Sequence, residues 1–242
     1  MLTITNIKRF IEKAVEQFKE YCPTIKLPPI VVCPSANRAK ARVKILSDCG
    51  LDYKEDSLSM LGEVISGSKA TKIVLYQARM RTQAIVNHCV WHELGHILFG
   101  NWSRFGLTKE DIDRATIPAY GYGLLNEFMA EYIAYEVNNY QPLAGNYFPN
   151  GYLYQAFYES DNLVQYKLSM YYAVLLGDSV FPEEEIEKGA EIISPPAWRI
   201  VCRMRNLLYN LTKADEFWNV DINFLTQLGY LCDMLLRVDF RV

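Results

Sequence analysis

The chain has neither an excess of basic residues nor a long apolar run, and both absences narrow the range of functions. Its 242 residues include 25 Lys and Arg against 28 Asp and Glu, a formal net charge of −3. Proteins that bind nucleic acid through its phosphates usually carry a basic excess, so we expect no nucleic-acid partner. No stretch approaches the roughly 18 uninterrupted apolar residues that a membrane-spanning helix requires, so we also expect no membrane partner.

Features of exported proteins are lacking too. Six cysteines are scattered without a CxxC pair: Cys22, Cys33, Cys49, Cys89, Cys202 and Cys232. The first residues, MLTITNIKRFIEKAVEQF, carry a charge at every turn and contain no apolar signal-peptide core. Cysteines in such a chain are expected to be reduced and mostly buried. The sequence therefore predicts a cytoplasmic protein, and it does not indicate the oligomeric state.

The first 140 residues show a mixed pattern of helices and strands. Half of the chain is hydrophobic, which is enough for a sizeable core. Apolar residues three and four apart predict an amphipathic helix over 4–20, and short β-rich runs predict strands at Ile30–Cys33 and Lys72–Tyr76. Residues 35–70 are expected to form loops, a hairpin or both. A long helix is predicted from about Arg79 to Phe99.

The remainder of the pattern is helical. Thr108 and Asp111 mark the start of a short helix, and we expect Pro118 to end or bend this helix. Another helix is predicted from about Leu124 to Asn139. Further helices are expected after Pro182, over 197–213 and along Ile222–Leu235. No flexible linker or internal repeat appears. The pattern predicts an α+β protein with a mixed part at 1–140 and an all-helical extension at 141–242 packed on it, or the two parts as one continuous domain.

All three histidines of the chain lie in one short segment, and their spacing indicates a metal site. They are His88, His92 and His96, and residues 92–96 read HELGH. Helical residues four apart lie about 40° apart around the axis and about 6 Å along it, so His92 and His96 can bind one ion. Glu93 is rotated by about 100° from His92. Its carboxylate can reach a water on the open position of the metal and take its proton.

The third histidine does not fit the same ion. His88 and His96 are two turns apart, about 12 Å along the axis, so a single tetrahedral ion cannot bind all three rings. We therefore assign His88 to packing or hydrogen bonding. The residues around the motif are uncharged, and burying two His and a Glu there is costly unless something binds them. This favours a metal site over a chance match.

A catalytic zinc needs a third protein ligand and one open position. With no histidine left, that ligand must be Asp, Glu or Cys. The acids downstream are Glu110, Asp111, Asp113, Glu127, Glu131 and Glu136. The first three belong to a short polar helix start. Glu127 and Glu131 lie four apart on an otherwise apolar helix, which indicates one ligand and one acid that orients a ligand imidazole, although the pattern does not decide which is which.

The segment HELGHILFG at 92–100, followed by NEFMAE at 126–131, resembles the gluzincin metallopeptidases. In that class, a Glu on a second helix completes the HExxH site. More narrowly, the chain is similar to the ImmA/IrrE-type peptidase family, in which a strand precedes the HELGH helix and the second helix carries Glu and then Ala three residues on. The similarity covers roughly residues 60–140 and is specific at HELGH.

The resemblance implies a fold, a cofactor and a set of roles. The fold would be a zincin-like metallopeptidase core, with a small sheet, an active-site helix and a second ligand helix. His92, His96 and Glu127 would bind Zn²⁺, Glu93 would be the general base, and Glu131 would lie behind the ligands. The reaction would be hydrolysis of a peptide or protein substrate, a particular regulatory protein rather than bulk protein.

The chain also departs from the family pattern. The family more often has Asp or Asn at the position of Glu131, and Tyr132–Val137 replaces a small, Pro-terminated stretch. No DNA-binding helix-turn-helix is visible. A Tyr or Arg would have to stabilise the oxyanion, and the sequence does not choose among candidates such as Tyr120, Tyr122, Tyr152, Tyr154 and Tyr158.

Two alternative interpretations remain. The chain could be a non-catalytic partner-binding or regulatory protein that retains a zincin fold, or a metal-free helical protein with an accidental motif. Glu93 argues against the first alternative, because a purely structural zinc site needs no general base and is usually closed by four protein ligands. Bound zinc that a chelator removes would exclude the second.

Overall fold

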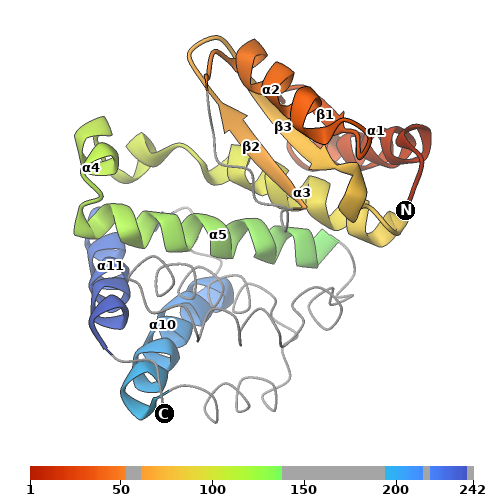
Figure 1. Cartoon of the computed structure of the whole chain (residues 1–242). Coiled ribbons are helices and arrows are strands. Elements are labelled where there is room, and N and C mark those ends of the chain that lie inside the picture. Colours follow the sequence, from red (N-terminus) through yellow and green to blue (C-terminus); the bar gives the residue numbers. More distant parts are fainter. Residues whose placement is uncertain (53–60, 138–193, 215–218, 239–242) are drawn as a thin grey trace. The chain divides into compact units, whose positions relative to one another are not determined.

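The computed structural model describes residues 1–52, 61–137, 194–214 and 219–238 (Figure 1). These residues form an α+β protein that is mostly helical and contains one small mixed sheet. The chain divides into two compact units, Met1–Leu98 with Glu136–Asn139, and Phe99–Tyr135 with Tyr140–Val242. The predicted division near residue 140 stays a prediction, since residues 138–193 lie outside the described part. No helix of that part is long and apolar enough to cross a membrane.

The first unit is built on a three-stranded sheet. Its strands are β1 (Ile30–Cys33), β2 (Gly62–Ser66) and β3 (Thr71–Tyr76), in the order β1-β3-β2. The central strand β3 runs parallel to β1 and antiparallel to β2, with Gly62 opposite Leu75. This confirms the two predicted strands, and β2 and β3 form the hairpin that was one expectation for 35–70.

The other part of that expectation is wrong, because residues 38–49 form a helix. Helix α2 (Arg38–Cys49) buries Arg42, Leu46 and Cys49 while its apolar Val43 is exposed. An amphipathic helix is recognised by apolar residues on its buried face. Here an arginine is buried and a valine is exposed, so the sequence pattern does not indicate a helix. Leu46 and Cys49 pack against Ile65, Val74 and Tyr76, so α2 covers that face of the sheet.

The other face of the sheet belongs to α3 (Gln83–Phe99), which packs in turn against α1 (Ile4–Tyr21) (Figure 1). The rings of Phe18 on α1 and Trp91 on α3 have centroids 5.2 Å apart. The amphipathic helix predicted at 4–20 is confirmed. Helix α3 ends as predicted but starts later than Arg79, because Gln77–Arg79 form a separate 3₁₀ turn, η1.

The second unit is helical throughout its described residues. Its elements are η2 (Trp102–Phe105), α4 (Lys109–Asp113), α5 (Ile117–Val137), α10 (Pro195–Ala214) and α11 (Ile222–Arg237). The capping box that begins α4 and the two C-terminal helices confirm the prediction, while the helix expected after Pro182 lies outside the described residues. Helix α5 begins earlier than Leu124. The prediction that Pro118 ends or bends the short helix is wrong, because α4 ends at Asp113 and Pro118 lies in the first turn of α5, where proline is tolerated.

Two glycines allow α5 and α11 to touch along their backbones. A Cβ at Gly121 would lie 1.9 Å from the carbonyl oxygen of Leu225, and a Cβ at Gly229 would lie 1.8 Å from that of Ile117. Real Cβ atoms do not approach other atoms so closely. The glycine in the first turns of α5, a weak helix former, therefore serves the packing of the two helices.

Candidate metal centre

His92 and His96 form a pair with the geometry of two ligands to one ion. Their Nε2 atoms are 3.1 Å apart, and their ring centroids are 4.7 Å apart with the rings nearly perpendicular, at 89°. Two imidazole nitrogens bound tetrahedrally to zinc at 2.0–2.1 Å would lie about 3.3 Å apart. A hydrogen bond between neutral rings would have a similar distance. The side chains therefore fit an ion without rearrangement of the helix.

Glu93 lies in a different environment from the histidines that flank it. It is 4% exposed, whereas both histidines are half-buried. Its carboxylate lies against strand β2, because a Cβ at Gly62 would be only 2.9 Å from Glu93 Oε1. A buried carboxylate in an apolar helix is costly to desolvate. That cost is typical of a residue kept for its chemistry rather than for packing.

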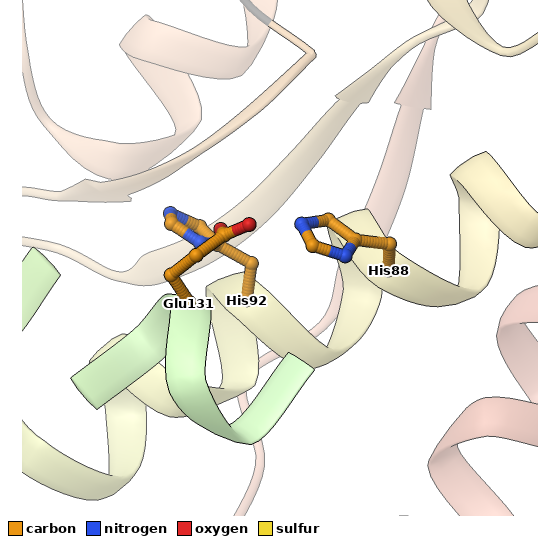
Figure 2. Close-up of side chains that lie close together, drawn as sticks. All are labelled: His88, His92 and Glu131. Carbon is orange, nitrogen blue, oxygen red and sulfur yellow. The ribbon is translucent and has the colours of Figure 1, made fainter. Parts of the chain in front are cut away.

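His88 lies one turn before the pair. Its ring is stacked on that of His92, with centroids 6.4 Å apart and planes 19° apart, and it is 8% exposed. Figure 2 shows both rings projecting from α3, together with Glu131. His88 therefore packs on a neighbouring ring, and it also belongs to a group of possible metal ligands.

Two groups among the described residues offer three ligand atoms within 4.8 Å of one another. One is His92, His96 and Glu127, and the other is His88, His92 and Glu131 (Figure 2). Neither group contains all three histidines, in agreement with the helix geometry. The first group is the predicted ligand set. The spacing gives a hint of the second group, since His88 precedes His92 by four residues and Glu131 follows Glu127 by four, but only the tertiary structure brings His88 and Glu131 together.

The acids of the polar segment have structural roles. The carboxylate of Asp111 accepts hydrogen bonds from the N–H and the hydroxyl of Thr108 at 2.8 and 2.6 Å, and these bonds lower the pKa of Asp111. Glu110 forms a surface ion pair with Arg114 at 2.9 Å. The structure thus supports leaving the helix start at 108–113 out of the site.

One of the tyrosines named as oxyanion candidates has a perturbed hydroxyl. Burial raises the pKa of Tyr122 to about 12, so this hydroxyl keeps its proton across the pH range of most enzymes. Its ring lies 5.9 Å from that of Phe105, a packing contact within the second unit. Tyr152, Tyr154 and Tyr158 lie outside the described residues.

Comparison with known proteins gives no match: no protein-family model, no curated protein and no solved structure matches this chain. The gluzincin resemblance therefore rests on the residues quoted for it and on the geometry of the histidine pair.

Proposed function

We propose that the protein is a zinc-dependent metallopeptidase of the gluzincin type. The observation that carries this proposal is the histidine pair of α3, whose Nε2 atoms are 3.1 Å apart, with the buried Glu93 on the same helix. Two half-buried imidazoles and a buried carboxylate within five residues are a poor choice for packing alone. They are the residue types that metal-dependent hydrolysis requires.

The proposed ligands are His92, His96 and Glu127. Glu131 does not bind the metal but accepts a hydrogen bond from a ligand imidazole and so orients its ring. Two nitrogens and one carboxylate oxygen are a usual donor set for catalytic zinc, with one position left open. The zincin-like core of this proposal comprises the small sheet, helix α3 and helix α5. The α+β class and the order of these elements along the chain agree with it.

Zinc, when bound, supplies a Lewis acid that polarises the peptide carbonyl and lowers the pKa of a water toward 7. The contribution of the chain is to hold and move protons. Glu93 accepts the proton of the attacking water and then donates it to the departing amine. Its burial keeps the carboxylate out of bulk solvent, and its attachment next to His92 on a rigid helix fixes its position relative to the ligands.

The proposal is tested by the metal content of protein purified without added zinc. We expect one equivalent of zinc that a chelator removes. His92→Ala and His96→Ala should each abolish it, because each removes one of three protein ligands. His88→Ala is the matched control on the same helix and should retain the metal.

Full zinc in the His92→Ala and His96→Ala proteins would refute the proposal. Loss of zinc in His88→Ala with full retention in His96→Ala would also contradict the assignment. In that case the ion would belong to the group of His88, His92 and Glu131.

A further inference from the structure

Gly62 is the first residue of strand β2, and its backbone conformation is one that any residue can adopt. The described glycines with a left-handed backbone are Gly50 and Gly106, at φ values of 81° and 79°, whereas Gly62 pairs with Leu75 as ordinary antiparallel strand. Glycine weakens a strand, and it is often found where another group approaches the backbone closely. The glycine at position 62 is therefore explained by the lack of room for a side chain and not by its backbone conformation.

The space is occupied by side chains from the metal-site helix. A Cβ at Gly62 would lie 2.8 Å from Cys89 Sγ, 2.9 Å from Glu93 Oε1 and 3.0 Å from Leu75 Cδ2. The first two atoms come from residues one turn apart on α3. The Glu93 carboxylate therefore packs directly on the backbone of β2, and any side chain at position 62 would displace it.

Strand β2 is also held by hydrogen bonds on the face of the sheet opposite to α3. Because successive strand residues point to opposite faces, Glu63 faces α2 while Gly62 faces α3. The Arg42 guanidinium donates to the Glu63 carboxylate and to the Tyr76 hydroxyl, and that hydroxyl donates to Glu63. All three residues are less than 5% exposed. This cluster joins α2, β2 and β3 immediately beside Gly62.

We propose that Gly62 is a positioning residue for Glu93. Its missing side chain lets the carboxylate lie on strand β2, and the buried cluster of Arg42, Glu63 and Tyr76 holds that strand in place. The role of Glu93 as general base rests on the proposed function. The contact between Gly62 and Glu93 does not, so the two can be tested separately.

The contact is tested by a double-mutant cycle on thermal unfolding. Gly62→Ala should lower the unfolding temperature of the wild-type chain, because the new methyl group collides with Glu93. In the Glu93→Ala background this collision is gone, so the loss should become smaller, and what remains comes from the contact with Cys89 Sγ. In the Cys89→Ala background the loss should persist, because Glu93 is still present. Coupling of this kind is expected only between residues in contact.

The positioning role is tested by hydrolysis at measured zinc occupancy. The probe is a pool of internally quenched peptides of mixed sequence. Gly62→Ala should keep one zinc while its rate falls by about a hundredfold, as expected for a displaced catalytic group. Val64→Ala, on the same strand and the same face, is the matched control and should keep both zinc and rate.

Two results would overturn the inference: a loss of unfolding temperature that Glu93→Ala does not reduce, or a Gly62→Ala protein with full zinc and the wild-type rate. Failure of the proposed function looks different. A wild-type protein without zinc would refute the metallopeptidase, while the unfolding cycle would still report on the contact.

Discussion

At the scale of single residues, helix α3 assigns different environments to neighbours in the HELGH segment. His92 and His96 are half-buried with their Nε2 atoms converging, whereas Glu93 is buried against β2. The rotation of about 100° per helical residue separates the proposed base from the proposed ligands. This division predicts that metal binding and proton transfer can be lost independently.

Glu93→Gln should keep both the zinc and the fold, because the amide has nearly the same shape and no ligand is removed. Hydrolysis should fall by roughly a hundredfold or more, the usual effect of removing a general base. Zinc analysis and the rate on the peptide pool check this on one preparation. A Gln variant that loses its zinc would show that Glu93 is a ligand or a structural element.

The two glutamates of α5 should differ in their effect on the metal. Glu127→Ala removes one of the three proposed protein ligands, whereas losing a residue that only orients a ligand typically costs 10–100-fold in affinity or activity. Competition titration with a zinc indicator should therefore show a much lower zinc affinity for Glu127→Ala than for Glu131→Ala. The affinity of Glu131→Asp should fall less than that of Glu131→Ala. The reverse ranking would make Glu131, which is 7% exposed, the ligand.

At the level of helices and strands, α11 packs against α5, the helix that carries Glu127 and Glu131. The contact is made at two glycines. The backbones meet at Gly121 and Gly229, where a Cβ would fall within 2 Å of a carbonyl oxygen of the other helix. The position of α5 therefore depends on α11.

Gly229→Ala should destabilise the protein by about 1–3 kcal/mol or more, the range for forcing extra atoms into a packed interior. Chemical denaturation measures this change. Gln227→Ala, at an exposed position of the same helix, should have little effect because it meets no neighbouring backbone. Equal stability of the two variants would show that the helices do not meet at Gly229.

The elements also show which signals are readable in sequence. Helix α1 and strands β1 and β3 were predicted because their buried residues are apolar and follow one period. Helix α2 was missed because Arg42 occupies its buried face, and a buried charge is visible only once Glu63 and Tyr76 are placed beside it. The start of α5 before Leu124 could not be predicted because Pro118 and Gly121 are poor helix formers, and Leu225, against which Gly121 packs, lies about a hundred residues later.

At the scale of the whole molecule, the candidate ligands come from two segments, at 92–96 and at 127–131. The histidine pair could be predicted because both residues lie about one helical turn apart, where spacing alone fixes geometry. The carboxylate could be predicted only as a choice of two, because both glutamates share a helix face. The grouping of His88 with Glu131 could not, because it depends on tertiary structure.

The central claim is that one zinc ion is bound by two imidazoles and a carboxylate. X-ray absorption at the zinc edge, on protein purified without added metal, tests it most directly. We expect a nitrogen and oxygen shell at 2.0–2.2 Å with the scattering signature of two imidazoles. A sulfur shell near 2.3 Å would show cysteine ligation, and the absence of a zinc edge would show that no zinc is bound. Either result would contradict the account.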